Sequence, residues 1–198
     1  MTAALERSVG RAFYRGSTTS VARRLLGAVL VQRSAEGRTA GRIVETEAYL
    51  AGDPAAHSFR GPTDRNRSMF LERGHAYVYR IYGLHHCFNV VTAPAGVGEA
   101  VLVRALEPLE GFELMARRRD GRSLGELCSG PARLVRAMGI GAEHDGVDLV
   151  GGALSIHAPP ARARRAGRIV SATRVGISRA ADEPLRFYIE GNPFVSRR

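Results

Sequence analysis

Apolar and polar positions alternate with a period of two along much of the chain, which predicts strands more often than helices. The predicted strands are residues 28–33, 38–49, 77–81, 86–91, 100–106, 153–157, 170–177 and 185–189. Short turns at residues 34–37 and 82–85 join neighbouring strands as hairpins. We therefore expect the α+β class: a single domain with a curved, mostly antiparallel β-sheet, flanking helices and a protruding β-hairpin.

The helical segments are fewer and have recognisable ends. They are predicted at residues 21–26, 108–118 and 131–138. Pro108 suits the first turn of the second helix, and Ser129 can cap the third. Residues 52–66 carry prolines and glycines and are predicted as a loop, and residues 159–167 form a basic run that we expect to be flexible.

The length of 198 residues fits one domain, with residues 1–16 as a loosely ordered N-terminal arm. A chain of this size buries about two-thirds of its unfolded surface, so it needs neither disulfides nor a metal to fold. Cys87 and Cys128 follow no pairing pattern and are expected to be free thiols. No apolar run has the length of a membrane span, and no secretory signal is visible. We expect a cytoplasmic, nucleoid-associated protein with no membrane partner.

The charge of the chain suggests a polyanionic partner. The formal net charge is +10, the isoelectric point is about 10.8, and all 29 basic residues are arginine. Such a basic domain favours nucleic acid, although genome composition accounts for part of the arginine content. Because lysine is absent, only the α-amino group of Met1 could form a Schiff base.

Two carboxylates lie close together on the longest predicted strand. Alternation places Glu45 and Glu47 on one face with Tyr49. Burying charged groups without partners is costly, so this face either lines a cleft or meets solvent, and the two interpretations are equally favoured. A metal site that adds Asp53 and His57 is chemically allowed, but its spacing matches no common metal motif.

The long loop contributes further polar candidates. His57 lies ten residues after Glu47, so the loop could fold it back beside that carboxylate. Arg65, Asn66 and Arg67 form either a solvated basic turn or a contact to DNA phosphates.

The hairpin at residues 77–91 adds aromatic candidates. Tyr77 and Tyr79 share one face of its first strand. Tyr82 lies at the tip, where an aromatic ring can either insert between base pairs or pack against a neighbouring loop.

Two polar residues interrupt apolar strands. The amide of Asn89 needs a backbone or ligand partner if it is buried. Arg104 needs an anion, and Glu45 or Glu47 is the natural candidate.

These residues fall in motifs that follow one another from about residue 23 to residue 196. The motifs are Glu45-Thr-Glu-Ala-Tyr49, Ala55-Ala-His57-Ser, Arg65-Asn-Arg67, Met69-Phe70, Tyr77-Val-Tyr79, Ile81-Tyr-Gly83, Asn89, Leu102-Val-Arg104-Ala-Leu-Glu-Pro-Leu-Glu-Gly111, Glu126-Leu-Cys-Ser-Gly-Pro131 and Pro184-Leu-Arg-Phe-Tyr188. In this order and spacing they resemble the alkyladenine (3-methyladenine) DNA glycosylase family. Each motif alone is weakly specific, whereas the whole series is highly specific.

The resemblance implies a base-excision repair enzyme that flips damaged purines out of double-stranded DNA, uses no cofactor or metal, and is a monomer. It also implies that Glu47 is the general base and that Arg104, with the carbonyl of Val175, holds the attacking water. The other implied roles are stacking on the flipped base for Tyr49, His57 and Tyr79, discrimination at the pocket edge for Asn89, and filling of the gap in the duplex for Tyr82.

The implied chemistry agrees with the residues. A purine alkylated at N3 or N7 is cationic and leaves as a neutral base, so one carboxylate that activates water suffices, whereas a deaminated purine also needs an acid. Without lysine, we expect a monofunctional enzyme that leaves an intact abasic strand. Two other interpretations stay open: a non-catalytic protein that binds damaged DNA, and a metal-dependent nuclease built on Glu45, Glu47 and Asp53.

Overall fold

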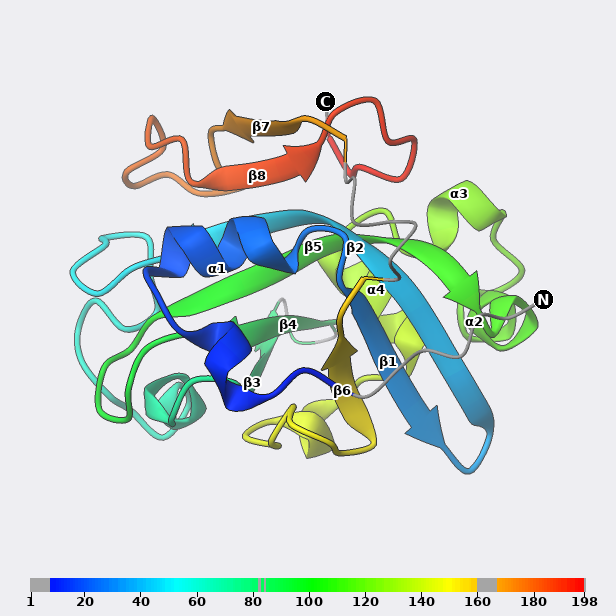
Figure 1. Ribbon diagram of the computed structural model, residues 1–198, viewed down its shortest axis with the longest axis horizontal. Helices are drawn as coiled ribbons and strands as arrows, with labels where there is room; N and C mark the ends of the chain where they lie inside the picture. The colour runs from blue at the N-terminus through cyan, green and yellow to red at the C-terminus, as the bar shows by residue number, and fades with distance from the viewer. Residues whose placement is uncertain (1–7, 82, 84, 160–166, 198) are drawn as a thin grey trace.

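The computed structural model describes residues 8–81, 83, 85–159 and 167–197. Its strands are β1 (Val29–Ser34), β2 (Gly37–Tyr49), β3 (Ala76–Ile81), β4 (His85–Val91), β5 (Ala100–Glu110), β6 (Leu154–His157), β7 (Ile169–Ala172) and β8 (Arg186–Ile189). Its α-helices are α1 (Thr18–Leu25), α2 (Phe112–Arg118), α3 (Leu124–Leu127) and α4 (Pro131–Met138), and its 3-10 helices are η1 (Arg11–Tyr14), η2 (Arg67–Phe70) and η3 (Ala142–His144). Figure 1 shows them packed around one curved antiparallel sheet, which confirms the expected α+β fold.

The sheet is organised around β2, the longest of the described strands. β2 pairs with β5 along one edge. Along its other edge it pairs first with β1, through residues 37–42, and then with β8, through residues 45–47. The strand order is β3-β4-β5-β2-β1-β6, with β8 added to β2 and β7 added to β8. The two glutamates therefore lie where β2 exchanges one neighbour for the other.

The ladder between β2 and β5 is irregular at the same place. The register shifts on both sides of Glu45, and the paired residues skip Val44 on β2 and Arg104 on β5. A bulge of this kind bends the strand and redirects its side chains. The strict alternation expected for residues 43–49 therefore does not hold through the bulge.

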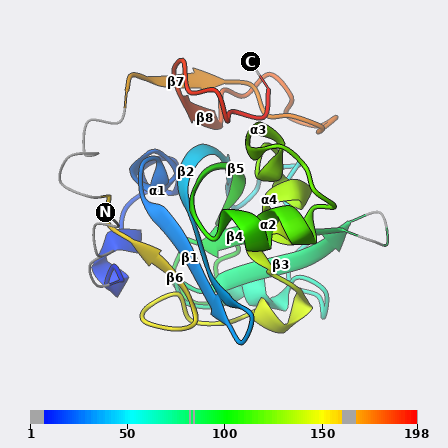
Figure 2. The same ribbon diagram turned by 90° about the vertical axis from the view of Figure 1, so that its right-hand side faces the viewer.

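The centre of β2 is buried on both faces. α1 packs against β2, whereas α4 packs against β4 and β5. Figures 1 and 2 place these two helices on opposite sides of the sheet. Every residue from 43 to 48 is buried, including Glu45 and Glu47. The interpretation of this segment as a solvated strand face is therefore wrong.

The helix predicted at residues 131–138 has the correct ends, whereas its predicted cap and the start of the first helix differ. Ser17 accepts a hydrogen bond from the backbone N–H of Ser20, so α1 begins slightly earlier than predicted. α4 spans its predicted range with Pro131 in its first turn. Ser129 does not cap it, because the N-cap residue is Gly130 and no side chain caps the helix.

Two segments differ from their predicted structure. Pro108 does not begin a helix: it pairs with Gly41 within β5, and α2 follows only after Gly111. Proline is tolerated there because β4 covers β5 only from residue 100 to residue 102, so the missing N–H faces an uncovered edge within the described residues. The strand predicted for residues 170–177 ends at Ala172, and the rest turns towards the cavity described below.

Residues 8–16 do not form the loose arm that the sequence suggests. Tyr14 is fully buried, and the Arg11 guanidinium donates a 2.6 Å hydrogen bond to Asp148. Residues 1–7 of the predicted arm lie outside the described part of the chain, as do residues 160–166 of the basic run.

The hairpin and the cysteines are as predicted. β3 and β4 pair from Ala76 opposite Val90 to Ile81 opposite His85, and Figure 2 shows this hairpin reaching away from the centre of the sheet. Cys87 and Cys128 are buried free thiols. Across the described ranges, no helix combines the length and the apolar character needed to cross a membrane.

Candidate active site

A cavity of about 510 Å³ opens beside the β3–β4 hairpin, and its walls include parts of the long loop at residues 52–66 and of the turn at residues 173–177. Cavities of this size commonly hold small organic ligands. The predicted site residues whose side chains line it are Tyr49, His57, Arg65, Tyr79, Asn89 and Arg104. The structure therefore brings together residues that are up to 55 positions apart in the sequence, from Tyr49 to Arg104.

Three aromatic rings pack together on one wall. The ring centroids of His57 and Tyr79 are 4.4 Å apart and their planes cross at 76°. Those of Tyr77 and Tyr79 are 5.3 Å apart, because alternation along β3 puts both side chains on one face. The Nδ1 atom of His57 lies 2.8 Å from the Tyr77 hydroxyl. Burial and the nearby positive charge of Arg65 lower the pKa of His57, so its imidazole is neutral at pH 7.

The loop that carries His57 is held in shape by Asn66. The buried Asn66 side chain accepts from the Thr63 N–H at 2.6 Å and donates to the carbonyls of His57 and Gly61 at 2.9 and 3.1 Å. The loop thereby sets His57 against the tyrosines, and none of the described contacts of His57 is with Glu47. Asn66 has a structural role, and its predicted contact with DNA stays a prediction.

The arginines that flank Asn66 are exposed. Arg65 reaches the cavity and donates a 2.9 Å hydrogen bond to the carbonyl of Arg80. Arg67 makes no ion pair with a described residue. Their contact with phosphates stays a prediction. Tyr82, at the tip of the hairpin, lies outside the described residues.

Glu47 is fully buried behind the cavity, and each of its oxygens has a donor. Its Oε1 atom accepts a 2.7 Å hydrogen bond from the backbone N–H of Val175 and lies 3.1 Å from Nη1 of Arg104. Its Oε2 atom accepts from the Tyr49 hydroxyl at 2.9 Å. Burial, and next the charge of Glu47, raise the pKa of Tyr49, so this phenol keeps the proton that it donates.

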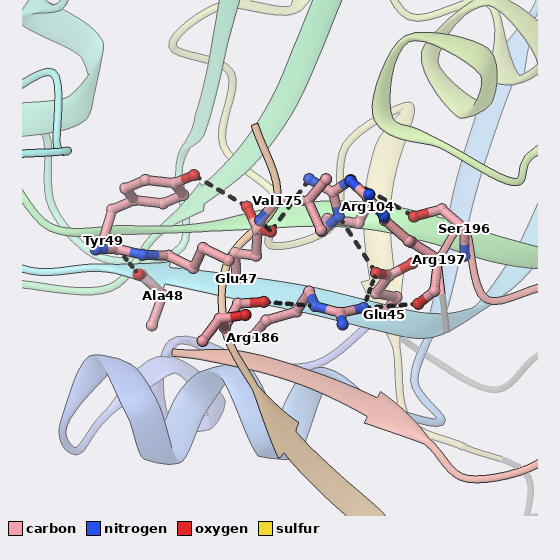
Figure 3. A network of polar contacts seen from close by, with 11 residues as sticks. Glu45, Glu47, Ala48, Tyr49, Arg104, Val175, Arg186, Ser196 and Arg197 are labelled. Atoms are coloured by element: carbon pink, nitrogen blue, oxygen red, sulfur yellow. Dashed lines mark hydrogen bonds and ion pairs between the residues drawn. The ribbon is translucent and has the colours of Figure 1, made fainter. Parts of the chain in front are cut away.

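Arg104 has the anionic partners that a guanidinium in an apolar strand requires. The guanidinium lies between two carboxylates: its Nε atom is 3.3 Å from Oε1 of Glu45, and its Nη1 atom is 3.1 Å from Oε1 of Glu47 (Figure 3). The predicted ion pair is confirmed, and it involves both candidates. A guanidinium shared in this way lets two buried carboxylates lie close together, because it offsets the cost of removing them from water.

A second buried ion pair was not predicted. Arg174 donates to the carboxylate of Asp53 and, at 3.1 Å, to the carbonyl of Ala48. Its guanidinium carbon lies 4.8 Å from the centroid of the Tyr49 ring. These contacts hold one side of Tyr49 and fix the turn whose next residue, Val175, donates to Glu47. Asp53 and Arg174 are 121 positions apart, so no local signal predicts this pair.

The side of the cavity formed by β4 holds an amide and a thiol. Asn89 is buried and donates to the carbonyl of Tyr77 at 3.0 Å, which supplies the expected backbone partner. No described group bonds to its Oδ1 atom, so this acceptor is available to a ligand in the cavity. Burial raises the pKa of Cys87, and the neighbouring Tyr79 hydroxyl lowers it to a lesser extent, so the thiol is protonated at neutral pH.

The carboxylates do not form a metal site. Glu45 and Glu47 share Arg104, and Asp53 is paired with Arg174. Among the residues that the structure describes, no three His, Cys, Asp or Glu side chains are grouped so that they could hold a metal ion. The geometry therefore argues against the metal-dependent nuclease, because guanidinium groups hold the carboxylates that such an enzyme would use.

Comparison with known proteins gives a consistent result. A family model described as methylpurine-DNA glycosylase matches residues 12–193. A relative from Methanoculleus marisnigri, named "Putative 3-methyladenine DNA glycosylase", is 56% identical over 188 residues, which cover 94% of this chain and 97% of the relative. Relatives of the same name from Mesorhizobium japonicum and Carboxydothermus hydrogenoformans are 48% and 45% identical, over 90% and 95% of this chain and 85% and 98% of their own.

Proposed function

The chain belongs to the methylpurine-DNA glycosylase family, and on this premise we propose that it is a monofunctional DNA glycosylase of base-excision repair. As the substrate we propose double-stranded DNA that contains an alkylated purine such as 3-methyladenine or 7-methylguanine. The reaction is hydrolysis of the N-glycosidic bond of a nucleotide that has been flipped out of the duplex. Deaminated purines form a second substrate group to be tested.

The observation that carries this proposal is the arrangement of Glu47 behind an aromatic cavity. A carboxylate offers about four lone-pair sites. Val175 and Arg104 occupy Oε1, and Tyr49 occupies one site on Oε2, so a further site on Oε2 can take a proton from water. We propose that Glu47 is the general base and that its negative charge stabilises the oxocarbenium-like sugar of the transition state.

Arg104 supports this role in two ways. Its ion pair offsets the cost of burying the Glu47 carboxylate, because a buried charge without a partner is strongly unfavourable. It also lines the cavity, where its remaining donor capacity can orient a water molecule. The participation of the Val175 carbonyl in holding that water stays a prediction.

The aromatic wall suits a cationic base. Tyr49, His57 and Tyr79 line the cavity, and we propose that a flipped purine stacks on them. Attraction between an alkylated, positively charged purine and desolvated aromatic rings contributes about 1–2 kcal/mol. The lowered pKa of His57 matters here, because a neutral imidazole does not repel that charge. We assign discrimination between purines to the available Oδ1 acceptor of Asn89.

The product follows from the absence of lysine. No side-chain amine can attack the sugar, so we propose that the enzyme leaves an intact abasic strand. We assign the exposed guanidinium groups of Arg65 and Arg67 to phosphates of the bound DNA.

A single-turnover excision assay tests this function. A duplex with one 3-methyladenine or hypoxanthine is incubated with excess enzyme and a chelator, and the products are separated with and without alkali. We expect strand cleavage only after alkali and no effect of the chelator. Cleavage without alkali would refute the monofunctional reaction. Tight lesion binding without release of any base would show a non-catalytic reader of damaged DNA.

A further inference from the structure

Glu45 has no function in the chemistry proposed above, although it is fully buried and both of its carboxylate oxygens accept hydrogen bonds. Its Oε1 atom accepts from Nε of Arg104 at 3.3 Å and from Nη1 of Arg186 at 2.9 Å. Its Oε2 atom accepts from the backbone N–H of Ser196 at 2.7 Å (Figure 3). Neither Glu45 nor Glu47 is among the residues that line the cavity, but Glu47 bonds to three residues that do, namely Tyr49, Arg104 and Val175, whereas Glu45 bonds only to Arg104 among them. The bonds of Glu45 therefore mainly hold other protein groups in place.

Glu45 and its three donors, Arg104, Arg186 and Ser196, form a buried polar cluster that we call the node. Arg186 connects this node to two other parts of the chain. Its Nη1 atom donates to the carbonyl of Arg197 at 2.8 Å, and its Nε atom donates to the carbonyl of Thr173 at 2.8 Å. Thr173 begins the turn whose residue Val175 donates its N–H to Glu47. Arg186 thus connects the C-terminal segment at residues 196–197 to the turn at residues 173–177.

Both donors to Oε1 of Glu47 therefore depend on the same node. Arg104 is held at its Nε atom by Glu45, which fixes the plane of the guanidinium and so the direction of Nη1. Val175 is held through Thr173 by Arg186. The strand ladder does not provide this constraint for Arg104, because the bulge between β2 and β5 leaves Arg104 unpaired in the register.

The charges at the node are balanced. Glu45 and Glu47 contribute two negative charges, and Arg104 and Arg186 contribute two positive ones, all on buried side chains. Removing one member leaves a net charge on these buried side chains. The remaining side chains would then rearrange, and the position of Glu47 would change with them.

We propose that Glu45, Arg186 and the backbone of residues 196–197 are a positioning network for the general base. The network sets the position of the Glu47 carboxylate indirectly, through Arg104 and through Val175. The C-terminal segment thereby affects catalysis without lining the cavity. This inference rests on the proposed function of Glu47. It predicts a loss in the chemical step rather than in binding, because the aromatic wall and the exposed arginines are not members of the network.

The test uses full-length variants in single-turnover excision at saturating enzyme. We expect Glu45→Gln to lower the excision rate by about 10- to 100-fold, since a displacement of about 1 Å in a reacting group costs up to about 100-fold. The Kd for lesion-containing duplex should change by no more than about twofold, the usual scatter of additive free energies. Glu110→Gln is the matched control: it removes a carboxylate that lies 3.7 Å from Nε of Arg38 near the end of the β2–β5 ladder and has no described contact with Glu45, Arg104, Arg186 or Ser196.

Ser196 provides a second, milder perturbation. Ser196→Pro removes the N–H that donates to Glu45, whereas Ser196→Ala keeps it and loses only the 3.5 Å contact of the hydroxyl with Arg104. We expect the proline variant to lose more excision rate than the alanine variant. Thermal unfolding midpoints identify any variant that fails to fold, and the other variant then decides the question.

A double-mutant cycle separates positioning from general destabilisation. If Glu45 acts through Arg104, then Glu45→Gln in an Arg104→Met background should cost much less than it costs alone. Equal losses in both backgrounds, or an unchanged rate in Glu45→Gln and Ser196→Pro, would overturn the positioning network. Glu47→Gln distinguishes this failure from that of the proposed function: a loss of excision there, with normal Glu45→Gln, refutes only the network, whereas an active Glu47→Gln refutes the general base itself.

Discussion

Glu47→Gln is the sharpest perturbation of the candidate site, because it changes one atom and the charge. The glutamine carbonyl can accept from Val175 and Arg104 as Oε1 does now, and its NH₂ group can donate to the Tyr49 hydroxyl, which then reverses its role. Arg104 and Arg186 must then share the single negative charge of Glu45. The hydrogen bonds that glutamine keeps offset part of this loss, so the cost in folding free energy should be about 3 kcal/mol, the lower end for breaking a buried ion pair. The expected fall in Tm is about 6–12 °C.

The effect on catalysis should be far larger. General base catalysis contributes about 10²- to 10⁴-fold, and electrostatic stabilisation in a buried site contributes about 10²- to 10³-fold. We therefore expect the single-turnover excision rate of 3-methyladenine or hypoxanthine to fall by about 10⁴-fold or more. Lesion binding, measured by fluorescence anisotropy with a labelled duplex, should be retained, because Tyr79 and His57 are unchanged.

The controls determine how this result is understood. Glu110→Gln removes a carboxylate of the same sheet that pairs only with Arg38 among the described residues, and it should keep normal excision and a similar Tm. A Glu47→Gln protein that folds, binds the lesion and excises within about tenfold of the unmodified protein would refute the reasoning, since this corresponds to only about 1.4 kcal/mol in the barrier. The general base would then be another group.

Three further predictions use other parts of the site. Arg174→Met leaves the buried carboxylate of Asp53 without its ion-pair partner, so the free energy of unfolding measured in urea should fall by about 3–5 kcal/mol. If the additional change Asp53→Asn restores stability, the broken ion pair is the cause. His57 has a lowered pKa in the folded state, so its contribution to stability is complete above its unfolded pKa of about 6.5 and is lost as the pH falls through the folded pKa. The affinity for a cationic base should weaken over the same pH range. His57→Gln should remove both effects, as measured by thermal melts and binding titrations at a series of pH values. Tyr82→Ala should weaken binding to lesion-containing duplex more than to a single-stranded lesion, and equal losses in the two titrations would contradict its role as a filler of the duplex gap.

The parts of the fold that the sequence predicted are those with local causes. Alternation along residues 38–49 and 100–106 and the glycine-containing turn at residues 82–85 identify the main strands and the hairpin, because strand period and turn chemistry act over a few residues. Arg104 was also predictable, since a guanidinium among apolar residues requires an anion wherever the chain supplies one.

The errors have non-local causes. Pro108 resembles a helix start, and only the end of β4 at one edge of β5 makes it acceptable in a strand. Glu45 and Glu47 resemble a solvated face, but the turn at residues 173–177 and the C-terminal segment at residues 196–197 contribute partners that bury them. Residues 173–177 alternate like a strand, but the strand ends at Ala172 and Arg174 pairs with the distant Asp53 instead. Each of these outcomes depends on residues too distant in sequence for local patterns to reveal.

The exchange of β1 for β8 as the neighbour of β2 also has a consequence for the order of folding. The contact between Glu45 and Ser196 joins residues 151 positions apart, whereas β2 meets β1 through a short hairpin. Contacts that close long stretches of chain form slowly, because the entropy of loop closure must be overcome first. During synthesis, residues 186–197 leave the ribosome after every other part of the site. We therefore expect a nascent chain to form its aromatic wall before the Glu47 carboxylate is held in position. The ability to bind the base would then arise earlier in folding than the ability to excise it.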